Sequence, residues 1–141
     1  MIRNKKQLST ARMQLTHMEQ ARAQSQGEST AGRLGPEIFK AMIAGMDAQI
    51  EELRQEIAEY ERLEREPAIL VRSLEDLPEA LIKARIARRL TQKELAAMLR
   101  LKPQQIQRYE STRYQSASLR RVLQVGEALG VRLDGELRAT R

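Results

Sequence analysis

The sequence predicts an all-α protein, and two observations lead to that class. Aromatic residues make up only 3% of the 141 residues, with no Trp and one Phe. Sandwiches and barrels rely on aromatic and β-branched residues, so the composition disfavours them. Apolar residues also recur at helical spacing in both halves of the chain. We therefore expect an N-terminal helical hairpin or coiled coil, then a compact helical domain whose C-terminal end could form a short β-hairpin or strand.

The first predicted helix covers roughly Lys5 to Gln24. Its apolar positions lie three or four residues apart, which places them on one face; they are Leu8, Ala11, Leu15, Met18 and Ala21. The next stretch, Ser25 to Gly35, contains three Gly among small polar residues and is predicted to be a loop. An antiparallel hairpin with the following helix is the simplest arrangement.

The clearest periodicity lies in the second predicted helix, which Pro36 can open and Pro67 would end. Apolar steps there alternate between four and three residues, as in a coiled-coil seam. Because the first helix has a thin apolar stripe, we expect part of this seam to pair two copies of the chain. A hairpin without a partner is the alternative. The predicted dimer seam is Phe39, Ile43, Met46, Ile50, Leu53, Ile57 and Tyr60.

The charge is unevenly distributed between the two halves. Residues 1–66 carry 10 Lys and Arg against 11 Asp and Glu, whereas residues 67–141 carry 15 against 8. This asymmetry suggests that the second half meets a polyanion. We predict a dimerisation or partner-binding region at 1–66, a linker at 67–76, a DNA-binding domain at 77–131 and a tail at 132–141.

Capping signals divide the second half into short helices. Pro78 can open the first, and Thr91 with Glu94 forms a capping box for a helix over 92–100. Lys102 and Pro103 open the next helix, and a last one runs from a Ser118 cap to Gly130. The stretch VRLDGEL (131–137) alternates apolar and polar residues around an Asp-Gly turn signal, which is typical of a strand or hairpin.

The stretch LTQKELAAMLRLKPQQIQRYE (90–110) resembles the helix-turn-helix of the lambda-repressor/Cro-like, or XRE, family. The residues that carry the resemblance are Thr91, Gln92, Leu95, Ala96, Leu99, Leu101, Ile106 and Tyr109. The resemblance implies a lambda-repressor-like DNA-binding domain in which Arg85 pairs with Glu110. Arg89 and Arg100 stand where the family usually has glycine, so we expect left-handed backbone there.

A helix-turn-helix places its second helix in the major groove, where Gln can pair with adenine and Arg with guanine. With Ile106 and Tyr109 turned inward, the predicted base contacts are Gln104, Gln105, Gln107 and Arg108. Phosphate contacts should come from the flanking residues. Those predicted are Gln92, Lys93, Lys102, Arg113, Tyr114, Ser116 and Ser118.

We interpret the protein as a dimeric transcriptional regulator, a repressor, that reads an inverted repeat in double-stranded DNA. One alternative is an antitoxin that represses its own operon and binds a toxin protein. Another is a coiled-coil adaptor that does not read DNA. The only histidine, His17, lies on a helix without a cluster of carboxylates, and there is no glycine-rich phosphate loop. We therefore expect no enzyme, catalytic residue, metal or cofactor.

The expected location is the cytoplasm. No apolar run approaches the roughly 20 residues that span a bilayer, and the N-terminus lacks the apolar core of a signal peptide. The absence of Cys fits a reducing compartment.

Overall fold

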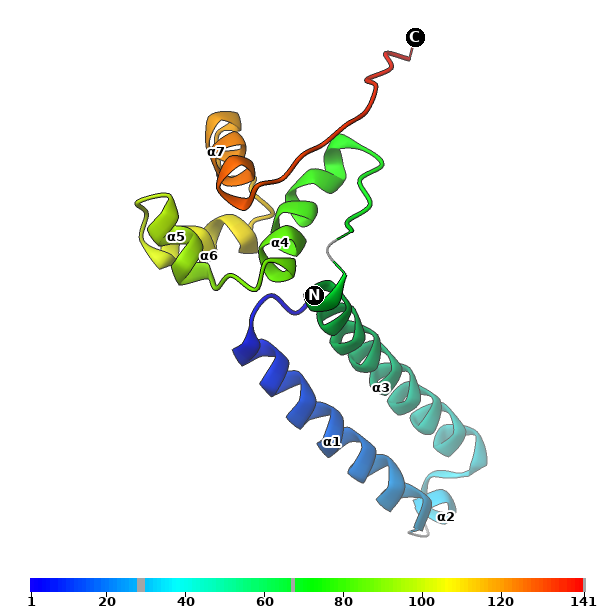
Figure 1. The fold of residues 1–141 in the computed structure, drawn as a ribbon. Helices are drawn as coiled ribbons and strands as arrows, with labels where there is room; N and C mark the ends of the chain where they lie inside the picture. The colour runs from blue at the N-terminus through cyan, green and yellow to red at the C-terminus, as the bar shows by residue number, and fades with distance from the viewer. Residues whose placement is uncertain (28–29, 67, 141) are drawn as a thin grey trace. The chain divides into compact units, whose positions relative to one another are not determined.

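The structure, a computed structural model, describes residues 1–27, 30–66 and 68–140 (Figure 1). All regular secondary structure in these ranges is helical, which confirms the predicted all-α class. The chain divides into two compact units, Met1–Arg62 and Leu63–Arg141. Among the described residues, no helix combines the length and apolar character needed to cross a membrane.

The N-terminal unit contains α1 (Lys5–Gly27), α2 (Thr30–Leu34) and most of α3 (Pro36–Arg65). Pro36 opens α3 as predicted. Gly35 lies between α2 and α3 with a φ of 77°, a left-handed conformation that glycine adopts without steric cost.

The predicted loop from Ser25 to Gly35 is wrong over most of its length. α1 continues to Gly27, where the Ser25 hydroxyl donates a hydrogen bond to the Ala21 carbonyl at 2.8 Å. Residues 30–34 form α2, a short helix that includes Gly32. Residues 28 and 29 lie outside the described residues, as does Pro67, the predicted end of the next helix.

α1 and α3 run antiparallel beside one another (Figure 1). Leu8 and Ala11 of α1 are buried, as are Ile50 and Ile57 of α3. Ion pairs flank these apolar residues: Arg54 lies 2.6 Å from Glu19, Arg22 lies 2.6 Å from Asp47, and Arg12 lies 2.7 Å from Glu61. The hydrogen bond from Arg22 holds the pKa of Asp47 below its usual value. His17 is exposed on α1.

The C-terminal unit is a bundle of short helices. It contains η1 (Leu74–Asp76), α4 (Leu77–Ala87), α5 (Gln92–Met98), α6 (Pro103–Ser111) and α7 (Leu119–Leu129). α5 packs on α6, and α4 packs on α7 and α6. Fully buried apolar side chains come from all four α-helices and form one shared core, which includes Leu81, Ile82, Ile86, Leu95, Ala96, Ile106, Val125 and Leu129.

The ends of these helices follow the predicted signals. Pro78 lies in the first turn of α4, and Thr91 and Ser118 cap α5 and α7. Gly130 ends α7 in the left-handed conformation, with a φ of 64°. α5 ends at Met98, two residues earlier than predicted, because the chain turns at Leu99 and Arg100 toward α6.

Residues 131–140 have no regular secondary structure and are exposed throughout. The short hairpin or strand suggested for 131–137 is therefore wrong for the single chain. A strand needs a neighbour for its N–H and C=O groups, and no strand is present in the described residues to supply one.

Candidate nucleic-acid interface

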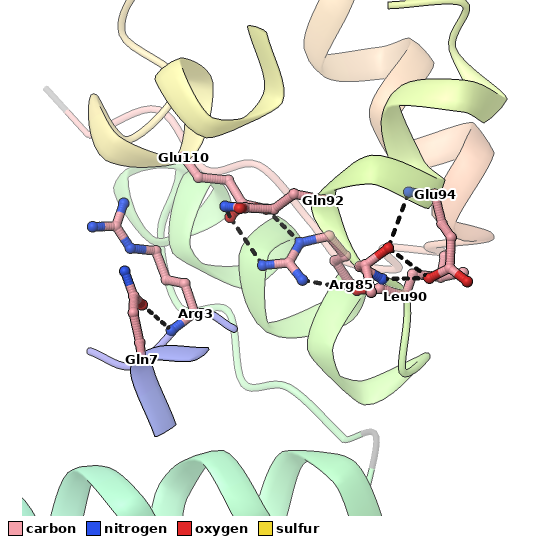
Figure 2. Close-up of polar contacts among 8 residues, drawn as sticks. Arg3, Gln7, Arg85, Leu90, Gln92, Glu94 and Glu110 are labelled. Atoms are coloured by element: carbon pink, nitrogen blue, oxygen red, sulfur yellow. Dashed lines mark hydrogen bonds and ion pairs between the residues drawn. The ribbon is translucent and has the colours of Figure 1, made fainter. Parts of the chain in front are cut away.

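The α5–turn–α6 segment has well-defined ends. The Thr91 hydroxyl accepts a hydrogen bond from the Glu94 N–H at 3.1 Å, and the Glu94 carboxylate accepts one from the Thr91 N–H at 2.7 Å (Figure 2). This reciprocal capping box satisfies two N–H groups that a helix end leaves without intrahelical partners. It fixes where α5 begins.

The turn between α5 and α6 is tight. Arg100 has a φ of 56°, so the left-handed backbone predicted at this position is confirmed. The Leu101 N–H donates to the Ala96 carbonyl at 2.8 Å, which closes the turn. Ala96 and Leu95 are fully buried. A larger side chain at Ala96 would push the two helices apart.

A buried ion pair with α4 holds α6 in position. Arg85 of α4 donates from Nε to Glu110 Oε1 at 2.5 Å and from Nη2 to Glu110 Oε2 at 2.9 Å (Figure 2). Their side chains are only 2% and 0% exposed, respectively. The pairing predicted from the family resemblance is confirmed. Because it is bidentate, it fixes the orientation of α6 as well as its distance from α4.

Two further groups complete this buried network. Arg85 Nη1 donates to the Leu90 carbonyl at 2.8 Å, and Gln92 Nε2 donates to Glu110 Oε2 at 2.6 Å (Figure 2). Gln92 was predicted to contact a phosphate, but its amide group is half-buried and bonded to Glu110. Its main contribution in this structure is therefore to link the first turn of α5 to the end of α6.

The opposite face of α6 is polar and exposed. Ile106 and Glu110 are buried and Tyr109 is half-buried. At 100° per residue, Gln104 and Arg108 lie at the centre of the outward face, one turn apart. Gln107 and Gln105 lie on its two sides. All four predicted base-contact side chains are exposed.

Gln105 has a second role that its exposure does not reveal. Its side-chain oxygen accepts a hydrogen bond from the Lys102 N–H at 3.1 Å, which caps the start of α6. Recognition of adenine by Gln uses the amide oxygen and nitrogen together. The cap occupies one acceptor site of the Gln105 amide oxygen and holds the side chain at the start of α6, so Gln104 is better placed to read a base.

Tyr114, predicted as a phosphate contact, is buried. Its ring stacks on Tyr109 with centroids 5.9 Å apart, and the side chain is 4% exposed. The hydroxyl has no hydrogen-bond partner among the described residues. Burial raises the pKa of this hydroxyl, and the nearby Glu110 carboxylate raises it further. Because the ring is packed in the core, the Tyr114 hydroxyl cannot contact a phosphate in this conformation.

The other predicted phosphate contacts lie at the surface. Lys93, Lys102 and Arg113 are exposed, and Arg113 lies 3.5 Å from Glu79. The Ser116 hydroxyl bonds Thr112 at 3.0 Å, and the Ser118 hydroxyl caps α7. The Ser118 hydroxyl accepts one hydrogen bond and can still donate its own proton. The Thr112 hydroxyl already donates to the Arg108 carbonyl at 2.8 Å, so Ser116 is the donor in its bond to Thr112.

Arg120, which the sequence analysis did not select, is exposed in the first turn of α7, beside the N–H groups that a helix start leaves without intrahelical partners. Among the described residues, no group of His, Asp and Glu side chains is arranged to hold a metal ion.

Residues 81–135 match the model of the Helix-turn-helix family. The match begins inside α4 and includes α5, α6, α7 and the start of the tail. It supports an XRE-type helix-turn-helix in this region, a DNA-binding domain of transcription regulators and not an enzyme family. Neither the curated proteins nor the solved structures gave a significant match to the chain.

Proposed function

We propose that the protein is a dimeric, sequence-specific transcriptional repressor that reads an inverted-repeat operator with α6 in the major groove. The observation that carries this proposal is the exposed polar face of α6, held in place by the buried Arg85–Glu110 pair. Gln104 and Arg108 would contact base edges. Gln107 would add a contact from the flank, and Gln105 one from its amide nitrogen.

The phosphate contacts in this proposal come from residues around α6. Lys93 lies in the first turn of α5 and Lys102 at the start of α6, while Arg113 follows its end. Ser118 would donate from the next loop, and Ser116 would do so only after its bond to Thr112 is exchanged for one to the phosphate. Cations on both sides of a reading helix hold it in register without reading sequence themselves.

The second copy is proposed to pair through α3. Phe39, Ile43, Met46 and Leu53 remain partly exposed along the predicted seam, although Ile50, Ile57 and Tyr60 are buried. A half-exposed row of large apolar residues at heptad spacing supports a partner helix. Two copies would present two α6 helices to half-sites about 34 Å apart.

The decisive experiment is selection of fragmented genomic DNA by the purified protein at near-physiological salt, followed by sequencing. We expect an inverted repeat with half-sites about 10 base pairs apart. The Gln104→Ala/Arg108→Ala double variant should recover no motif, whereas Gln115→Ala, at an exposed Gln outside α6, should recover the same motif. Recovery of DNA without any motif from the unaltered protein would refute sequence-specific reading.

An antitoxin is the second candidate, and it depends on apolar residues of the N-terminal unit. Met13 on α1 and Ile38 on α3 are 59% and 61% exposed. In this reading, the unit binds a toxin protein in addition to the operator. Sedimentation of the purified protein separates the two proposals. A dimer without any partner supports self-pairing of the chain, and a monomer that dimerises only with a co-purified protein supports the antitoxin.

A further inference from the structure

The C-terminal tail has the pattern of a strand but no neighbour to pair with. Val131, Leu133 and Leu137 fall on alternate residues, and all three are exposed, Leu137 to 82%. Arg132, Asp134, Glu136 and Arg138 occupy the other alternate positions. This period of two places the leucines on one side of an extended chain and the charges on the other.

An open apolar groove lies beside the tail. It has a volume of about 490 Å³ and lies between α4, the segment before η1 and the start of the tail. Its lining includes Ile69, Val71, Leu77 and Leu133. The apolar side of the tail therefore continues an apolar surface of the same unit, and a second extended segment laid along the tail would cover both.

The charged residues of the tail can pair with those of a second tail that runs in the opposite direction. In an antiparallel pair that aligns residue 132 of one copy with 136 of the other, Arg132 faces Glu136 at both ends. The same alignment places Val131 opposite Leu137 and Leu133 opposite Gly135. Directly opposed residues of opposite charge stabilise an antiparallel pair. Asp134 of one copy would lie opposite Asp134 of the other at the two-fold axis. This pair of like charges is the one unfavourable contact of this register.

We propose that residues 131–137 of two copies pair as antiparallel strands, so that the tail is a second dimer contact, built on the DNA-binding domain itself. The occupant of the open strand edge is thus the same segment of a second copy. Pairing would satisfy the backbone groups of the tail and cover its leucines and part of the groove.

This contact would join the two DNA-binding domains near their own ends. The tail directly follows α7, which packs against α4. A strand pair at this point would therefore restrict how far apart the two α6 helices can lie. That consequence at an operator rests on the proposed function, whereas the strand pairing itself does not.

The absence of Cys from the chain makes a cysteine scan decisive. Each residue from 132 to 138 is changed in turn to Cys in the full-length protein, and the disulfide-linked dimer is measured after mild oxidation without DNA. Opposed residues in antiparallel strands have Cα atoms about 4.5–5.5 Å apart, within disulfide reach. We expect one maximum, at Asp134→Cys, with yields several-fold lower at 132 and 138.

The control is Gln115→Cys, at an exposed site outside the tail. A single maximum between residues 133 and 135 supports the strand pair, because only residues near a two-fold axis face themselves. Even yields along the tail, equal to the yield at residue 115, overturn it. Arg132→Glu should weaken self-association, and the Arg132→Glu/Glu136→Arg double variant should restore it; failure of that rescue also counts against the proposed register.

The two proposals fail separately in these measurements. A flat cysteine profile with intact operator selection would remove the tail contact alone. A sharp maximum without any selected DNA motif would remove sequence-specific reading and leave the strand pair in place.

Discussion

Arg85 is fully buried, yet its charge is compensated on several sides. It bonds both oxygens of Glu110 and the Leu90 carbonyl, and Gln92 adds a further donor to Glu110. Burying two charges is costly, and mutual attraction offsets that cost only when the remaining hydrogen-bonding groups are satisfied. The pair thus fixes the geometry of α4 and α6 more than it adds net stability.

Removing one partner of this ion pair should lower the free energy of unfolding far more than replacing both partners. Arg85→Ala or Glu110→Ala leaves an uncompensated buried charge, so we expect each to lower the free energy of unfolding by about 3–5 kcal/mol. Replacing both by apolar residues, as Arg85→Met/Glu110→Leu, should cost much less. Urea unfolding followed by far-UV circular dichroism measures both. Equal losses in the single and double variants would contradict this account.

Arg100 supplies a second prediction for a single residue. Its φ of 56° is costly for a residue with a Cβ, by about 1–2 kcal/mol, whereas glycine adopts it freely. After the greater entropy of unfolded glycine is subtracted, Arg100→Gly should stabilise the fold by about 0.5–1 kcal/mol. Arg108→Gly, within α6, should instead destabilise by about 1 kcal/mol. Thermal unfolding compares the two; a loss at residue 100 would show that the arginine makes compensating contacts.

At the scale of elements, α6 combines a buried face that positions it with an exposed face for recognition. Gln104→Ala and Arg108→Ala should each reduce discrimination between the selected operator and a site with that base pair changed, by about 1–3 kcal/mol. Lys93→Ala should weaken binding to both DNAs equally, because it would contact a phosphate. Competition titrations with the two duplexes measure the difference. Unchanged discrimination in both α6 variants would place the reading surface elsewhere.

The element before α4 should respond to acid. The carboxylate of Asp76 accepts the Arg72 N–H at 2.9 Å and the Ser73 N–H at 3.1 Å, and these bonds hold the pKa of Asp76 below its usual value. A lowered folded-state pKa gives stability that is present above the unfolded pKa and lost as the pH falls through the folded one. Asp76→Asn should therefore be less stable than the unaltered protein at neutral pH. The difference should shrink once the pH falls below the usual aspartate pKa, and a constant difference across that range would contradict the assignment.

Local sequence signals predicted the start of α5 and both ends of α7 well, because a capping residue defines each of those ends. Thr91, Ser118 and Gly130 act through groups within one helical turn, so the sequence alone identifies them. The role of Tyr114 depended on packing against Tyr109, and its local sequence of polar neighbours suggested a surface loop. The residues of α2 lacked apolar periodicity and contained a glycine, so their helix was hidden from a pattern-based prediction.

Gln92 and the tail show a second kind of limit. Gln92 lies at a helix start, a position that favours anion binding. Its amide group instead donates a hydrogen bond to the buried Glu110 carboxylate of α6. The tail alternates like a strand, yet a strand forms only when another segment supplies its hydrogen bonds. In both positions the deciding partner is distant in sequence or belongs to another molecule.

At the scale of the whole molecule, the excess positive charge lies in the half that contains α6. Residues 67–141 carry 15 Lys and Arg against 8 Asp and Glu. If two copies neutralise roughly six phosphates, the logarithm of the binding constant should fall with the logarithm of salt concentration at a slope of about −5. Lys102→Ala should make this slope shallower by about 2 per dimer, one phosphate for each copy. An unchanged slope would remove Lys102 from the phosphate contacts.

Pairing through the α3 seam and binding of two half-sites should be lost together if α3 holds the dimer. Met46→Glu/Leu53→Glu would place charges on the half-exposed seam of α3, whereas Ala48→Glu adds one charge to an exposed position off the seam. Because a buried unpaired charge is costly, the seam variant should sediment as a monomer or a weaker dimer, and the control should not change. Loss of one half-site contact should also reduce the salt slope to about half. If the seam variant keeps its dimer and its full slope, α3 does not pair the chains, and the tail alone would have to bring the two reading helices together.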